Sequence, residues 1–276
     1  MSIYRSSIAG SSRALRLLVT SSALLAASLT GTPASAQFPP LSPPKLDQLV
    51  ARIALYPDPL LAQVLTAATY WTQIPEAAAW ASQHSYMTPD QIAKAIQQDH
   101  LQWDPSVLAL LPFPSVLEMM ANDPVWLEQL ANAVLTQRGD VMDAVQRMRR
   151  KAMEFGYLQS NPYMNVISNE GYIEIVPPNP GVIYVPTYDP VVVFSHPARG
   201  LEIGGAIRFG PGITIGALFA PFGWTRPGFL WPSHTIFIDR PWERVWANRE
   251  VYVHPYARRW VRPIGPRVER HELRRR

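Results

Sequence analysis

The sequence has 276 residues, of which 47% are hydrophobic, and it contains no cysteine. The lack of cysteine excludes disulfides, thiolate metal sites and a lipid-anchored cysteine, while the hydrophobic content is typical of a globular protein with a packed core. Residues 37–200 carry 9 basic and 15 acidic residues, net −6, whereas residues 201–276 carry 13 and 6, net +7. We interpret this asymmetry as an acidic body followed by a basic tail.

Residues 1–36 have the features of a signal peptide. Arg5, Arg13 and Arg16 precede an apolar run over residues 17–29, and the segment TPASA at residues 32–36 places small residues where a signal peptidase cleaves. The alternative is an N-terminal membrane anchor, but the apolar run is shorter than the roughly 20 residues that span a bilayer. We therefore predict an exported protein of the periplasm or outer envelope, not lipid-anchored, whose mature chain begins at Gln37.

Helix signals run through the body. A proline-rich leader over residues 37–44 precedes a helical pattern that begins at Lys45 and ends at Tyr56-Pro57. Four further helix starts are predicted where a capping residue precedes a proline, at Asp58-Pro59, Thr88-Pro89, Asp104-Pro105 and Asp123-Pro124. This position favours a capping role over a catalytic role for the three aspartates.

A long segment from Trp126 to Gly156 keeps helical spacing, and a break at Gly139 predicts either two helices or one bent helix. It ends in a basic cluster of Arg147, Arg149, Arg150 and Lys151. Such a cluster fits a phosphate-binding patch, but bases in the last turn also complement the helix dipole, and we favour the second interpretation.

The periodicity changes from helical to alternating after residue 162. Strands are predicted over residues 172–176 and 182–185, and a third over residues 191–194 follows the turn Tyr188-Asp189-Pro190. We expect these strands to form a small antiparallel unit that packs on the helices. The predicted fold class is α+β, with a mainly helical N-terminal body, a small antiparallel β unit and an irregular, partly β C-terminal tail.

Four segments of the body stand out in this order: LDQLVARIALYPDPLLAQVLTAATY, WDPSVLALLPFPSVLEMM, DVMDAVQRMRRKA and IYVPTYDPVVVF. Together they resemble the bacterial domain-of-unknown-function family numbered 3300, over about residues 45–194. The resemblance implies an exported envelope protein of Gram-negative bacteria with no established activity, and therefore no catalytic residues. Its signature residues are candidates for an interaction site: Tyr56, Asp58, Trp103, Asp104, Tyr184, Tyr188 and Asp189.

The remaining residues, 195–276, form the tail and include an apolar, glycine-rich segment over residues 201–224. Gly200, Gly204, Gly212 and Gly216 have the small-xxx-small spacing that lets helices approach closely in a membrane. Glu202, Arg208 and Pro211 interrupt the segment, so its apolar runs are too short for a span of roughly 20 residues. We expect a buried or interfacial segment, and a membrane-inserted assembly is the alternative.

Arginines and aromatic residues alternate beyond Gly223. In an exported protein this chemistry suits anionic glycans, lipopolysaccharide phosphates or acidic membrane surfaces rather than nucleic acid. Two other interpretations remain open: the aromatics form the core of short strands such as 235–238 and 250–253, or the arginines dock on the acidic body of the same chain or of a second copy. The candidate contacts for an anionic ligand are Arg244, Trp246, Arg249, Arg258, Arg259, Trp260 and Arg262.

No pattern of catalytic or metal-binding residues stands out. The six histidines lack the spacings of metal sites, and Ser233-His234 with Asp239 lacks a nucleophile elbow, so we predict no metal and no cofactor. Asp189 follows the aromatic residues Tyr184 and Tyr188, but a side-chain turn before proline accounts for it. We therefore predict a non-catalytic envelope interaction or scaffold protein, with an envelope hydrolase that uses Asp189 and a nearby histidine as the alternative.

Overall fold

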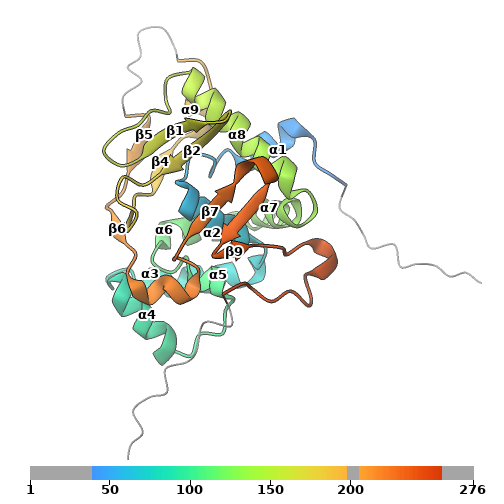
Figure 1. Cartoon of the computed structure of the whole chain (residues 1–276). Helices are drawn as coiled ribbons and strands as arrows, with labels where there is room; N and C mark the ends of the chain where they lie inside the picture. The colour runs from blue at the N-terminus through green and yellow to red at the C-terminus, as the bar shows by residue number, and fades with distance from the viewer. Residues whose placement is uncertain (1–38, 198–204, 257–276) are drawn as a thin grey trace, which may run out of the picture. The chain divides into compact units, whose positions relative to one another are not determined.

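The computed structural model describes residues 39–197 and 205–256. These residues belong to one compact unit that begins at Phe38 (Figure 1). The predicted signal peptide over residues 1–36 lies outside the described residues. The same is true of Arg258, Arg259, Trp260 and Arg262 in the tail.

The first part of this unit is helical, and every α-helix in it except α8 has a proline in its first turn. Proline is favourable there because the first N–H groups of a helix have no partner within the helix. The helices are α1 (Pro43–Val50), α2 (Asp58–Ala68), η1 (Trp71–Gln73), α3 (Ile74–Gln83), α4 (Pro89–Gln98), α5 (Pro105–Leu108), α6 (Pro114–Ala121), α7 (Pro124–Thr136) and α8 (Arg138–Glu154).

Three of the four predicted caps are confirmed. Thr88 forms a capping box with Gln91 at the start of α4, while Asp104 accepts a hydrogen bond from the Ser106 amide (2.9 Å) and Asp123 from the Trp126 amide (3.0 Å). The predicted cap at Asp58 is wrong, because Pro57 is the N-cap of α2 and Asp58 is its first residue. The proline therefore correctly indicated where the helix begins, but the Asp58 side chain does not cap this helix.

The first helix differs from its predicted limits at both ends. Helix α1 starts at Pro43, inside the predicted leader, and ends at Val50, and residues 51–56 form turns. Side chains from distant parts of the chain donate hydrogen bonds to carbonyl groups of this turn. The Tyr188 hydroxyl donates to the Ala51 carbonyl (2.9 Å), and the Arg149 side chain donates to the Ala54 carbonyl (2.8 Å). The turn is thus held by tertiary hydrogen bonds that local sequence does not reveal.

Of the two predicted alternatives for residues 126–156, the structure has two helices, α7 and α8, rather than one bent helix. The break lies at Gln137, two residues before Gly139, because Gln137 leaves the helical conformation at the end of α7. The Gln137 side chain accepts a hydrogen bond from the amide of Leu41 (2.9 Å) and so ties the start of the unit to this break.

The β structure consists of short antiparallel pairs. Strand β2 (Tyr172–Val176) agrees with the prediction, but its partner is β1 (Asn165–Asn169). Strands β3 (Val182–Ile183) and β4 (Pro186–Tyr188) pair with two strands from the glycine-rich segment, β6 (Ile213–Thr214) and β5 (Ile207–Phe209). The strand predicted over residues 191–194 is wrong: these residues follow an aspartate–proline pair and form the short helix α9 (Pro190–Val193).

The tail contributes one further sheet, with the order β7 (Pro227–Leu230), β8 (Thr235–Ile238) and β9 (Arg240–Pro241). The predicted strand over residues 235–238 is confirmed, whereas residues 250–253 form no strand. Short 3-10 helices connect these parts: η2 (Ala217–Phe222), η3 (Trp231–Ser233) and η4 (Trp246–Asn248). The α+β fold class is therefore confirmed.

A single core joins the body and the tail. Leu60, Leu61 and Leu65 of α2 are fully buried, and α2 packs against α7 and against β7, which crosses α2 in Figure 1. Phe219, Phe222, Trp231, Ile236, Ile238, Trp242 and Tyr256 of the tail belong to the same core. Across the described residues, no helix has both the length and the apolar character that a bilayer span requires.

Candidate functional site

The signature residue Asp58 belongs to a buried ion pair. Its carboxylate lies 2.6 Å from Arg149 Nη1 and accepts hydrogen bonds from the Trp231 indole (3.1 Å) and the Ile175 amide (3.3 Å). Asp58 is 6% exposed and Arg149 is fully buried. Burial raises the pKa of the Asp58 carboxyl, and Arg149 opposes this shift. Arg149 is thus an internal residue that links α2, α8 and the tail, and it cannot belong to a surface phosphate patch.

The turn signature around Asp189 is also part of the framework. The Tyr188 hydroxyl donates to the Ala51 carbonyl and accepts from the Leu55 amide (3.2 Å). The Asp189 carboxylate is exposed and accepts from the Val191 amide (2.8 Å), which caps α9 as the side-chain turn predicts. The ring of Tyr184 packs edge-on against Tyr163, 5.2 Å away. The contacts of Tyr184, Tyr188 and Asp189 therefore hold this turn and its neighbours in place.

The second signature segment lies elsewhere on the body. The Trp103 indole donates to Glu76 (3.3 Å), and the Asp104 carboxylate accepts from both the amide and the hydroxyl of Ser106. Burial raises the pKa of Asp104, while hydrogen bonds from Ser106 and Tyr70 lower it. The structure therefore does not bring all the signature residues into one site.

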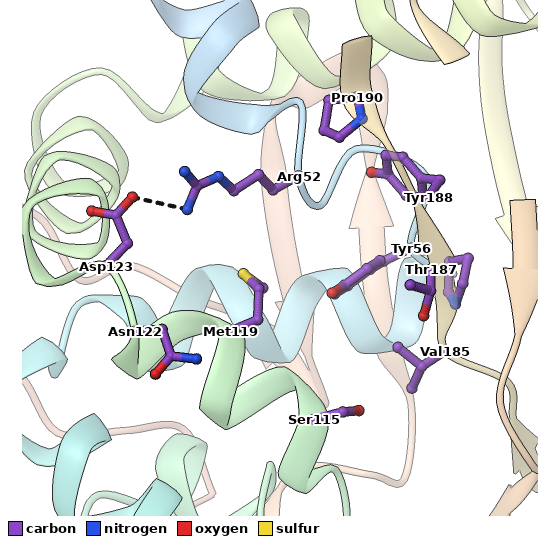
Figure 2. Close-up of a pocket in the computed structure, with 11 residues that line it drawn as sticks. Arg52, Tyr56, Ser115, Met119, Asn122, Asp123, Val185, Thr187, Tyr188 and Pro190 are labelled. Carbon is purple, nitrogen blue, oxygen red and sulfur yellow. Dashed lines mark ion pairs between the residues drawn. The ribbon is translucent and has the colours of Figure 1, made fainter. Parts of the chain in front are cut away.

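A pocket of about 660 Å³, here called the signature pocket, lies beside the Tyr188-Asp189-Pro190 turn (Figure 2). Figure 2 shows the Tyr56 hydroxyl pointing into the pocket, and Arg52 reaching across to Asp123 in an ion pair of 2.9 Å. Burial raises the pKa of Tyr56, which keeps its hydroxyl protonated as a hydrogen-bond donor. The remaining lining residues come from the end of α6 and from the segment that contains β4 and the start of α9: Ser115, Met119, Asn122, Val185, Pro186, Thr187, Tyr188 and Pro190.

The signature pocket offers hydrogen-bonding groups but no acid–base pair around Asp189. Among the residues that the structure describes, no histidine lines it. The His234 ring lies 2.7 Å from Asp143 on α8, and the Ser233 hydroxyl donates to the Leu230 carbonyl (3.2 Å). Ser233 and His234 therefore make separate structural contacts and do not form a nucleophile–base pair with each other. Throughout the described residues, no group of three or more His, Asp or Glu side chains is placed to hold a metal ion.

The tail forms a second hollow of about 280 Å³, here called the arginine pocket, with residues of η1 and α7. It brings together three candidates for an anionic ligand, Arg244, Trp246 and Arg249. The Arg244 guanidinium lies over the Tyr70 ring at 3.7 Å, and that of Arg249 over the Trp246 ring at 4.0 Å. The other lining residues are Thr69, Trp71, Thr72, Glu128, Ala131, Asn132, Leu135 and Glu250.

Arg244 is only 9% exposed and is held in place by the body and the tail. It donates to the Thr69 hydroxyl (3.2 Å) and to the Arg249 carbonyl (3.4 Å). Its Nε–H is buried and has no hydrogen-bond partner among the described residues. Because this atom is closed to solvent, Arg244 contributes positive charge to the wall of the pocket, while the exposed donors of the pocket belong to Arg249.

The arginine pocket adjoins a buried cluster that the sequence did not point to. Arg138 Nε, Trp242 Nε1 and both ring nitrogens of His254 are buried and have no hydrogen-bond partner among the described residues. Arg138 stacks on Trp242 at 4.9 Å, and its guanidinium donates to the Trp242 and Arg244 carbonyls. Burial, together with the charge of Arg244, lowers the pKa of His254 to about 3, so this imidazole is neutral. The role of Arg138 in this cluster has no local sequence signal, because Arg138 is a basic residue at the start of an ordinary helix.

Comparison with known proteins provides one relative and one family. The chain is similar to Uncharacterized protein YacH of Escherichia coli (strain K12), with 33% identity over 205 residues, covering 59% of this chain and 33% of that relative. The chain thus matches less than half of the relative's length. No solved structure matches the chain significantly. A family model described as "Protein of unknown function (DUF3300)" matches residues 42–260, which extends beyond residue 194 and includes the arginine pocket, and the chain therefore belongs to this family.

Proposed function

We propose that this protein is an exported, non-catalytic interaction module of the cell envelope. In this proposal the helical body is the scaffold, and the basic, aromatic tail contacts anionic envelope components or an envelope protein partner. The predicted signal peptide supports export. The observation that carries the contact is the arginine pocket, where Arg244 and Arg249 stand side by side with aromatic rings at a surface hollow.

The contacts of four aspartates of the body support a scaffold role for it. Asp58 neutralises a buried arginine, and Asp104, Asp123 and Asp189 accept hydrogen bonds from amides at helix starts. A carboxylate occupied in this way stabilises the fold and is poorly placed to transfer protons to a substrate. The arginine side chains of the tail, in contrast, have the planar donors that suit carboxylate and phosphate groups.

Co-sedimentation with purified sacculi and with outer-membrane vesicles tests this proposal. The proteins to compare are the mature chain, residues 37–276, and a variant in which Arg249 of the arginine pocket and the arginines of residues 257–276 are replaced by glutamine. Substitution is preferable to truncation at Gly200, because truncation would remove Trp231 and Trp242 from the core.

We expect the mature chain to sediment at low salt, to be released as salt screens the charges, and to sediment less when the arginines are removed. Equal sedimentation of both proteins, or sedimentation that salt does not change, would refute an electrostatic contact through the tail. A mature chain that stays soluble with both preparations would refute the envelope contact itself.

A further inference from the structure

We infer that the arginine pocket binds a single carboxylated sugar residue, the sugar carboxylate accepting from the exposed guanidinium of Arg249 beside the buried positive charge of Arg244. This inference rests on the proposed function and names the chemical class of its ligand.

The donors select a small anionic acceptor. Arg244 is held rigidly by Thr69, by the Arg249 carbonyl and by the Tyr70 ring, so its positive charge has a fixed position behind the wall of the pocket. The Arg249 side chain, 35% exposed, lies over Trp246 and donates to the Trp246 carbonyl (2.6 Å). A carboxylate can accept from the exposed part of this guanidinium, and such charge-assisted bonds are stronger than neutral ones.

The aromatic wall favours a sugar over an inorganic anion. Trp71 is 36% exposed and lines the same hollow as Trp246. An exposed indole provides an apolar surface with a polar edge, and pockets that bind organic ligands combine such surfaces with a few directional polar groups. The C–H face of a sugar ring matches an indole face, whereas a bare phosphate ion has no apolar surface to offer.

Two acids on the rim decide between a sugar and an acidic membrane. Glu128 is exposed, and the Glu250 side chain is 80% exposed and 3.4 Å from Arg249. These carboxylates would repel a surface that carries many negative headgroups. They can, however, accept hydrogen bonds from sugar hydroxyls, as can the Asn132 side chain on α7. The mixed charges therefore fit a single sugar residue that carries one carboxylate and several hydroxyls.

The size of the hollow limits the ligand. Its volume of about 280 Å³ lies just below the range of about 300–1,000 Å³ that is typical of small-molecule sites. One ring fits such a volume, and the rest of a glycan would continue along the surface. The pocket is therefore suited to one charged residue of a chain rather than to a buried oligosaccharide.

Isothermal titration of the mature chain with trigalacturonate tests the inference, and the methyl ester of the same trisaccharide is the uncharged control. We expect trigalacturonate to bind at least tenfold more tightly than its ester. Arg249→Gln and Trp71→Ala should each weaken binding, while Arg240→Gln, which removes an exposed arginine from β9, should not. Glucose 6-phosphate serves as the phosphorylated comparison and should bind more weakly than trigalacturonate.

Equal affinity for the acid and its ester would overturn the inference, as would equal losses in R249Q and R240Q. Tighter binding of glucose 6-phosphate would assign the pocket to phosphate instead. Arg249→Lys keeps the charge without the planar donors and should bind less tightly than wild type, which separates recognition from net charge. If the chain sediments with envelope preparations but does not bind trigalacturonate, only the sugar assignment fails. If the chain binds trigalacturonate but does not sediment with envelope preparations, only the proposed function fails.

Discussion

Replacement of Arg149 by methionine should destabilise the protein strongly. Arg149 lies fully buried, pairs with Asp58 at 2.6 Å, and donates to three carbonyl groups, those of Ala54, Tyr56 and Ile173. Methionine has a similar length but leaves the Asp58 carboxylate buried without its cation. Removing one partner of a buried pair costs about 3–5 kcal/mol, so we expect a loss of this size in the free energy of unfolding.

Urea unfolding followed by circular dichroism measures this loss, and thermal unfolding should show it as a fall in Tm of about 6–20 °C for a chain of this size. Arg150→Met is the matched control, because Arg150 is the adjacent arginine on α8 and is exposed. Its effect should stay within about 0.5 kcal/mol.

A double-mutant cycle separates the ion pair from general packing. If Asp58 and Arg149 interact as the structure indicates, Asp58→Leu combined with Arg149→Met should cost less than the sum of the single changes, by about 2 kcal/mol. Strict additivity would refute the pairing. So would a loss in Arg149→Met no larger than that in Arg150→Met.

Three further predictions test other parts of the structure. Tyr188→Phe removes the hydroxyl that bonds Ala51 and Leu55, and should lower the free energy of unfolding by about 1–3 kcal/mol in urea titrations, whereas Tyr163→Phe, at an exposed ring, should have little effect. Because the pKa of His254 is lowered to about 3, the unfolded state binds more protons below pH 6.5, so stability should fall with decreasing pH by about 1 kcal/mol per unit; His254→Leu should flatten this slope in unfolding measured from pH 7 to 5. Export from a bacterial host should yield a mature chain starting at Gln37, and a retained Met1 in N-terminal sequencing would contradict the predicted cleavage.

Helix positions followed from sequence because their signals are local. A capping residue and a proline act within one turn, so Thr88-Pro89 and Asp123-Pro124 begin helices whatever packs against them. The same pattern explains the error at residues 191–194. Their valines favour a strand, but Asp189-Pro190 starts a helix there, and the stronger local signal prevails.

Strand partners and buried charges could not be predicted in this way. Strands β3 and β4 pair with β6 and β5, which lie some 20–30 residues away in the chain, and pairing at that distance depends on tertiary packing. Gly212 shows the constraint: an added Cβ would come within 2.7 Å of Val182, so glycine is needed for β3 and β6 to meet. Arg149 looked like any basic residue of a helix end, because burial has no local signature when the partner lies 91 residues earlier.

The aromatics and arginines of the tail were open to two interpretations, core packing and contact with an anionic ligand, and both can hold for the same segment. Its aromatics fill the core, as Trp231, Trp242 and Tyr256 show, and this packing is what fixes Arg244 and Arg249 at the surface hollow. Arg138 on α8 holds the same segment by donating to the Trp242 and Arg244 carbonyls, so the body positions the tail's guanidinium groups. A binding site on a rigid support loses less side-chain freedom when a ligand arrives. The contact and the scaffold are therefore not separable parts of the chain: loss of binding on cutting the tail would be expected from the damage to the core alone, and only point substitutions in the arginine pocket can assign recognition to it.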